Sequence, residues 1–129
     1  MDQTNYLRDA KINFFLREDA DTISASTDIA WALFTTSTTT TGGGTEMTGG
    51  TPAYARQPLT FSDPALTGDT QNTAAIAVPC SGETVVAVAI MDSTSGGNMM
   101  YHEVLTSAIA TSDGDTLDWS TGTIDVEER

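Results

Sequence analysis

The amino-acid sequence predicts a mainly β protein: a single antiparallel β-sandwich of about seven short strands with one N-terminal α-helix. Residues 4–17 contain the one stretch in which apolar side chains recur at helical spacing. After it, short runs rich in Val, Ile, Thr and aromatic residues alternate with clusters of Gly, Ser, Asp and Pro, which is typical of strands joined by turns. The length suits one domain, so we treat residues 1–129 as a single unit, with the sandwich body over 29–127.

The helix predicted over residues 4–17 is amphipathic. Its apolar side chains gather on one face and its basic side chains on the other, and Thr4 or Asn5 can cap its first turn. The acidic run 18–21 ends the periodicity. We predict that this helix forms the main contact with the rest of the domain or with a partner subunit, with Phe14 and Phe15 as anchors. The predicted interface residues are Tyr6, Leu7, Arg8, Lys11, Phe14, Phe15 and Arg17.

Seven runs have the composition of strands. The run 84–91 is continuously apolar, which predicts a strand buried on both faces. The run 122–127 alternates polar and apolar residues, which predicts an edge strand guarded by its acids. The complete set is 29–36, 54–62, 73–78, 84–91, 98–107, 115–119 and 122–127.

Gly and Ser clusters mark the predicted connections. Residues 92–97 and 120–122 each lie between apolar runs and predict hairpins. Residues 35–51 form a low-complexity segment of Thr and Gly, which predicts an exposed loop or tip. The glycine clusters lack the lysine and hydroxyl of a phosphate-binding loop, so we interpret them as turns.

The charge is strongly acidic and unevenly distributed. Eighteen Asp and Glu residues oppose five Lys and Arg residues, for a formal net charge of -13. Residues 1–17 hold three basic and two acidic side chains and carry +1, which leaves -14 on the remainder. Such a molecule repels phosphate backbones and anionic lipid, so we expect neither nucleic-acid nor membrane binding. No secretory signal and no apolar run of ~18 residues occurs, and we expect a soluble protein made in a cytoplasm.

The sequence offers little catalytic chemistry. Cys80 is the single cysteine, has no basic neighbour and is interpreted as inert. His102 is the single histidine and is expected on the polar face of a strand. No nucleophile-elbow pattern accompanies any serine, and the abundant acids come with no aromatic-lined groove that would indicate a sugar site. We therefore expect no enzyme activity, no catalytic residues and no cofactor.

Three acids in SDGDTLD raise the question of calcium. Asp113, Asp115 and Asp118 supply carboxylates around a glycine, but the twelve-residue loop and its terminal bidentate Glu are missing. A tight turn into a strand explains them equally well. We expect no bound metal, with the two interpretations open at this point.

Landmarks along nearly the whole chain resemble a known family. They are Tyr6-Leu-Arg-Asp-Ala10, Trp31-Ala-Leu-Phe-Thr35, Gly43-Gly-Thr-Glu46, Tyr54-Ala-Arg-Gln57, Ile90-Met-Asp92, Gly96-Gly-Asn-Met-Met-Tyr101, Gly114-Asp-Thr-Leu117 and Thr123-Ile-Asp-Val126. In order and spacing they are similar to short tailed-bacteriophage structural proteins, often described as tail-fibre or minor virion proteins. The resemblance implies a β-sandwich behind an N-terminal helix, in the virion, made in the host bacterial cytoplasm, without catalytic residues. Pro58 departs from the family pattern and predicts an edge or bulged strand.

The resemblance leaves two functions open. The favoured one is a capsid decoration or cement protein that binds the major capsid protein, stabilises the head shell and forms a homo-oligomer, with a trimer favoured. The alternative is a tail-fibre, turret or head-fibre subunit that binds the host surface, with loop 35–51 facing the receptor. A cellular enzyme or regulator is the remaining alternative.

Overall fold

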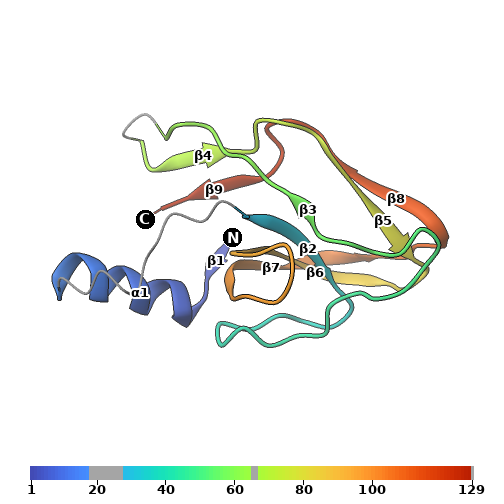
Figure 1. The fold of residues 1–129 in the computed structure, drawn as a ribbon, viewed down its shortest axis with the longest axis horizontal. Coiled ribbons are helices and arrows are strands. Elements are labelled where there is room, and N and C mark those ends of the chain that lie inside the picture. Colours follow the sequence, from blue (N-terminus) through green and yellow to red (C-terminus); the bar gives the residue numbers. More distant parts are fainter. Residues whose placement is uncertain (18–27, 65–66, 129) are drawn as a thin grey trace.

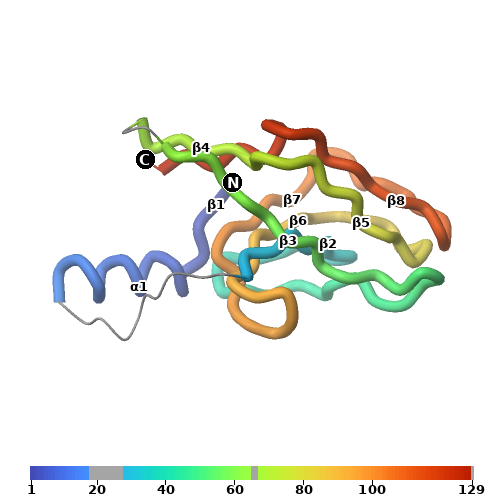
Figure 2. The backbone as a smooth tube through the Cα atoms, turned by 45° about the horizontal axis from the view of Figure 1, so that its top comes forward, coloured from blue at the N-terminus to red at the C-terminus, as the bar shows by residue number. Residues whose placement is uncertain are grey.

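The computed structural model describes residues 1–17, 28–64 and 67–128. A five-stranded sheet has the order β1-β7-β6-β2-β3, and two-stranded ribbons join β4 to β9 and β5 to β8. All these pairings are antiparallel. Figures 1 and 2 show the two-stranded ribbons beside the five-stranded sheet, and the helix projecting from one end of the molecule. The elements are β1 (Asp2–Gln3), α1 (Asn5–Leu16), β2 (Ala30–Phe34), β3 (Gln57–Pro58), β4 (Asp69–Gln71), β5 (Ile76–Ser81), β6 (Val85–Met91), β7 (Met99–Ile109), β8 (Asp113–Trp119) and β9 (Asp125–Glu127).

The predicted fold class is confirmed: the described chain is mainly β, its sheets are antiparallel, and one helix lies near the N-terminus. The helix begins as expected, because the Thr4 hydroxyl accepts a hydrogen bond from the Leu7 amide at 3.4 Å. The acidic run 18–21, predicted to end the helix, lies outside the described residues.

Strands β2 and β6 lie at the centre of the sheet and are buried on both faces. We call the face that carries Trp31, Leu33, Val88 and Ile90 the inner face, since these side chains belong to the main core. The ribbons supply the opposing layer of that core with Val78, Cys80, Ile124 and Val126, and the loops add Met47 and Leu59. The double burial predicted for 84–91 is confirmed, because Val86 is the only residue of β6 that is not fully buried.

The opposite, outer face carries small and flexible apolar side chains. Ala32, Phe34, Ala87, Ala89, Met91 and Met99 form a second buried cluster there. The Thr/Gly loop packs against it: a Cβ at Gly44 would stand 3.0 Å from the Phe34 ring, so glycine permits this close approach. The loop tip also reaches the start of α1, where the Asn5 amide donates to the Thr40 carbonyl at 2.7 Å.

The prediction that residues 35–51 form an exposed loop is only partly right. Residues 39–42 are exposed, but Thr38 is buried and Met47 is 1% exposed. The reason is that the exposed edge of β2 needs backbone partners. The Thr35 amide donates to the Thr45 carbonyl at 2.8 Å, and the Met47 amide donates to the Leu33 carbonyl at 3.0 Å. The loop therefore extends the sheet and contributes to the core.

His102 is also placed differently from the prediction of a polar-face residue. It is 5% exposed, pairs in register with Ala89, and its Nδ1 lies 2.9 Å from the Thr38 hydroxyl. Strand alternation puts it on the outer face, and the loop covers that face. Its Nε2 is buried, and no residue of the described chain hydrogen-bonds it.

The connections confirm one predicted hairpin and correct the other. The turn at 92–97 joins β6 to β7, with the Asp92 carboxylate accepting from the Asn98 amide at 2.6 Å. The turn at 120–122 is not a hairpin, because β8 pairs with β5 and β9 pairs with β4. The buried Asn72 separates the two strands: its side chain donates to the Ser120 carbonyl and accepts from the Ile124 amide.

The seven predicted runs all contain strands, but two strands were missed. Of the run 54–62, β3 keeps only Gln57–Pro58, at the edge of the sheet as Pro58 predicted. The edge character of 122–127 is confirmed, since β9 pairs on one side with β4. β1 and β4 escaped prediction because two or three polar residues give no alternation signal.

We expect Met47→Ala to lower the free energy of unfolding by about 2–5 kcal/mol, because it leaves a cavity beside the inner face. The exposed neighbouring substitution Thr48→Ala should change it by less than about 0.5 kcal/mol. Urea unfolding of both variants measures this. Equal stability of the two variants would mean that the loop is a free tip, as the sequence suggested.

Candidate interaction surfaces

The predicted interface on α1 is divided by the structure into a side that contacts the body and a side that faces away. Ala10 is buried, and Leu7 and Lys11 are half-buried toward β7. Phe15 is 71% exposed and Phe14 is 38% exposed, so neither is an anchor buried in the body. Their predicted role can be only in contact with a partner. Tyr6 is also exposed, at 43%.

The basic residues of α1 have local partners. Lys11 donates to Gln3 at 3.0 Å and forms an ion pair with Glu128, and Gln3 donates to the same carboxylate at 2.8 Å. Tyr101 also donates to Glu128. These contacts fasten α1 to both β1 and the segment after β9. Arg8 and Arg17 lie outside this network and donate to Asn5 and Asn13, respectively.

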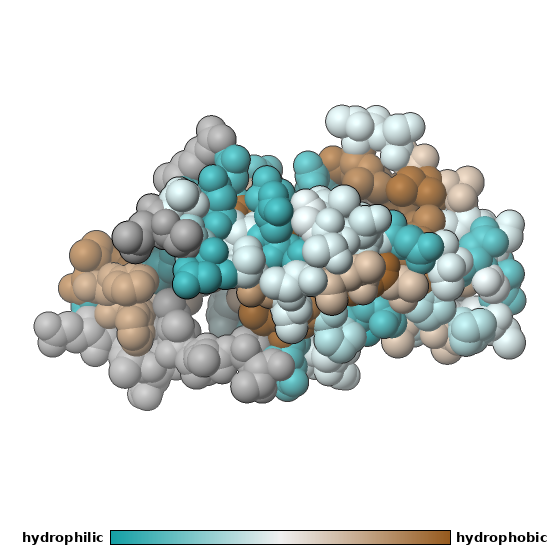
Figure 3. Space-filling model, turned by 90° about the horizontal axis from the view of Figure 1, so that it is seen from above, coloured by the Kyte–Doolittle hydropathy of each residue, from teal (hydrophilic) through white to brown (hydrophobic). Residues whose placement is uncertain are grey.

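An apolar stripe runs along the side of α1 that faces away from the body. Its apolar residues are Ile12, Phe15 and Leu16, and the basic Arg8 continues the same helix face at the i, i+4, i+7, i+8 spacing. Ile12 is 52% exposed and Leu16 is 78% exposed. Figure 3 shows apolar surface at the end of the molecule where α1 projects. We call these four residues the outward stripe. Ile12 and Leu16 were missed in the sequence, although their spacing from Arg8 and Phe15 could have identified them.

A second polar centre joins three loops around Arg56. Its guanidinium makes two hydrogen bonds of 2.8 Å to the Glu46 carboxylate and donates to the carbonyls of Ser93 and Gly96. Tyr54 donates to the same carboxylate at 2.8 Å. Burial raises the pKa of Glu46, but the hydrogen bonds from Arg56 and Tyr54 outweigh it and hold the pKa below its ordinary value. Four hydrogen bonds from Arg56 and one from Tyr54 are made within the fold, so this cluster fastens loops together.

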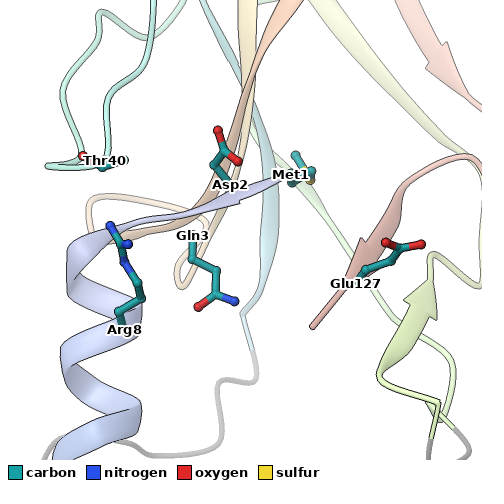
Figure 4. A pocket seen from close by; sticks show the side chains of 6 residues that line it. All are labelled: Met1, Asp2, Gln3, Arg8, Thr40 and Glu127. Atoms are coloured by element: carbon teal, nitrogen blue, oxygen red, sulfur yellow. The ribbon is translucent and has the colours of Figure 1, made fainter. Parts of the chain in front are cut away.

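Hollows line the open side of β1. The larger, of about 580 Å³, is surrounded by Met1, Asp2, Gln3, Arg8, Thr40 and Glu127. Figure 4 shows Asp2 and Gln3 pointing to opposite sides of β1, with Thr40 and Glu127 across from them. Most of these side chains are exposed and polar, which suits water better than a specific ligand.

A smaller hollow of about 280 Å³ opens between the inner face and the connection from β8 to β9. We call it the tryptophan hollow. Its floor is the buried set Trp31, Val88 and Ile124; its walls are the half-buried Met1, Leu105 and Trp119; and its rim is the exposed set Glu103, Thr123 and Asp125. The Trp31 and Trp119 rings meet edge to face, with centroids 5.4 Å apart. The sequence did not indicate this aromatic pair, because the two residues lie 88 positions apart.

The described residues contain no metal site, and their cysteine is buried. Asp113 accepts from the Thr51 amide and Asp115 from the Ser112 amide, each at 2.7 Å, so Asp113 fastens the Thr/Gly loop and Asp115 serves the turn. No group of three or more His, Cys, Asp or Glu in the described ranges could hold a metal ion. Cys80 is fully buried, and burial raises the pKa of its thiol. No helix within these ranges is long and apolar enough to cross a membrane.

Comparison with known proteins identifies the family. Residues 2–127 match the model of the podophage GP4 fiber I protein gp80. The match covers nearly the whole chain, so the protein belongs to this family of short-tailed-phage structural proteins, which are part of the virion. No curated protein matches the chain.

We expect two separate losses of stability on acidification. Burial lowers the pKa of His102, so the unfolded chain takes up the proton first and the unfolding free energy falls as pH falls below 6.5. The pKa values of Glu46 and Glu128 are also lowered, so their contribution is present above 4.5 and is lost as pH falls below it. Solvent screens the more exposed Glu128, so Glu46 should account for most of the lower step.

Urea unfolding across both pH ranges measures these losses, with His102→Gln as the diagnostic variant. It should lose the upper step and keep the lower one. An upper step that survives in the variant would assign it to another group.

Proposed function

We propose that the protein is a non-catalytic subunit of a fibre on the particle of a short-tailed phage. The observation that carries the proposal is the match of residues 2–127 to a fibre protein family. The family description names a fibre and not a head decoration, so it favours the alternative considered from the sequence over the cement protein. The polar clusters around Arg56 and Asp113 hold loops in place. This structural use of the polar side chains is consistent with a binding role.

We propose further that copies of the chain associate through the outward stripe of α1. Ile12, Phe15 and Leu16 together expose large apolar side chains on a helix that projects from the body. Burying such a side chain contributes about 1.5–3 kcal/mol, which is a strong driving force for association. The body, residues 29–127, holds eleven acids against one Arg, carries -10 and repels another body, whereas the segment that contains α1 carries +1. Copies therefore meet through their helices, with their acidic bodies apart, and a trimer is the expected assembly.

The double substitution Phe15→Ser with Leu16→Ser should convert the oligomer to a monomer without a loss of monomer stability, because both side chains are exposed. Light scattering at low and high ionic strength measures the mass. Salt should favour the wild-type oligomer, because it screens repulsion between the bodies.

The matched control for the stripe is Val104→Ser, since Val104 is an exposed apolar residue on β7, 44% exposed. It should leave the mass unchanged. If the wild-type protein stays monomeric at both ionic strengths, the proposal that copies associate through α1 is wrong.

Copy number and position in the particle test the fibre assignment directly. We expect quantitative mass spectrometry of purified virions to find a few to a few dozen copies, and labelling to place them on a fibre. Particles without the protein should keep the heat stability of their heads and lose adsorption. Hundreds of copies over the head, with heads weakened by their removal, would restore the capsid-decoration hypothesis.

A further inference from the structure

We propose that the tryptophan hollow binds one uncharged sugar ring. The inference deepens the proposed fibre function, since it names the class of surface ligand that the body would contact. It rests on three properties of the hollow: its shape, its hydrogen-bonding groups and its charge.

The shape suits a single ring. The hollow measures about 280 Å³, at the lower end of ligand-site sizes, and it is closed below by side chains of the main core. Trp119 is half-buried, so part of its aromatic surface stays available in the wall while the ring packs edge to face with Trp31. Aromatic side chains offer an apolar surface to the carbon-bound hydrogens of a sugar, and Tyr and Trp add a polar group.

The hydrogen-bonding groups require a ligand that both donates and accepts. The indole N–H of Trp31 is buried, and no acceptor in the described chain satisfies it. A buried donor in this state favours any ligand that brings an acceptor. On the rim, the Glu103 and Asp125 carboxylates can only accept, and neither makes a side-chain hydrogen bond or ion pair among the described residues. Sugar hydroxyls fulfil both demands, because each donates one hydrogen bond and accepts others.

The Trp31 N–H is covered in the unliganded protein, so a bound hydroxyl reaches it only if the wall adjusts. Met1 and Leu105 line the same hollow and are half-buried. Methionine is unbranched at its end and repacks readily. The proposal therefore requires a side chain that lines the hollow, such as Met1, to move aside and uncover the Trp31 N–H.

The charge of the site selects against acidic sugars. Two carboxylates stand at the rim against the single α-ammonium group of Met1, and the body, residues 29–127, carries -10. A uronic acid or a sugar phosphate would meet like charge at short range, whereas a neutral hexose, deoxyhexose or N-acetylhexosamine would not. A small organic cation would satisfy the carboxylates and the aromatic wall, but it brings no acceptor for the Trp31 N–H.

Intrinsic fluorescence reports on this site specifically, because the two tryptophans of the chain are Trp31 and Trp119. The purified full chain is titrated with neutral methyl glycosides of hexoses, deoxyhexoses and N-acetylhexosamines, with glucuronic acid, and with tetramethylammonium, a cation that has no hydrogen-bond acceptor. We expect at least one neutral glycoside to shift the emission, with a Kd on the order of millimolar for a single ring. Glucuronic acid should bind at least about tenfold more weakly.

The rim variants Glu103→Gln and Asp125→Asn test the assignment without disturbing the fold, since both side chains are exposed. Each should weaken glycoside binding by about tenfold or more, because an amide replaces an ionised acceptor. Asp118→Asn is the matched control: it removes an exposed acid of β8 outside the hollow and should leave binding unchanged.

Three results would overturn the proposal. In the first, tetramethylammonium shifts the emission and no neutral glycoside does, which makes the hollow a cation site. In the second, no probe shifts the emission. In the third, glycoside binding survives in both rim variants. None of these results bears on copy number or position in the particle, so failure of the sugar site remains distinguishable from failure of the fibre assignment. Inhibition of phage adsorption by the bound glycoside would then identify a cell-surface sugar, as opposed to a free one, as the ligand.

Discussion

Strand β6 carries apolar side chains on both of its faces, so the chain has to supply two separate covers for it. The ribbons cover the inner face with large side chains and form the main core. The outer face presents Ala32, Ala87 and Ala89, which permit a close approach of backbone, and the Thr/Gly loop lies there. A polar loop can cover this apolar face because its hydroxyl groups find partners, as Thr38 does with His102. The burial of His102 is thus a consequence of how β6 is enclosed.

The Thr/Gly loop is fastened to the β6–β7 turn by Arg56. Its guanidinium joins the end of the Thr/Gly loop through Glu46 to the β6–β7 turn through two carbonyls. Its side chain is 9% exposed and that of Glu46 is 25% exposed, so loss of one partner would leave a partly buried, uncompensated charge. Four of the segments that resemble the phage family, around residues 46, 54–57, 92 and 96, lie at or beside this joint. The resemblance therefore includes residues that fasten the loops.

Features that depend on neighbouring residues could be predicted from the sequence, and features that depend on distant contacts could not. Thr4 as the helix cap, the double burial of 84–91 and the edge position of Pro58 follow from local rules. The 120–122 turn was misassigned because Asn72, 48 residues from Ser120, decides where the chain goes next. The tryptophan hollow could not be predicted, because it forms only where Trp31 and Trp119 meet across the core. The apolar spacing on α1 was visible, but only the structure shows which side the body leaves uncovered.

The uneven charge connects the two proposed surfaces. Three of the five basic side chains lie in residues 1–17, so α1 is the part of the molecule that can approach another acidic copy without strong repulsion. In the proposed assembly, repulsion between the bodies would keep them apart and leave their faces open to ligands. The same negative field surrounds the tryptophan hollow and disfavours anionic sugars there. Acidic side chains are sparse on α1 and numerous on the β layers. This uneven distribution would both orient the subunits in the proposed assembly and restrict the ligands that their exposed ends can bind.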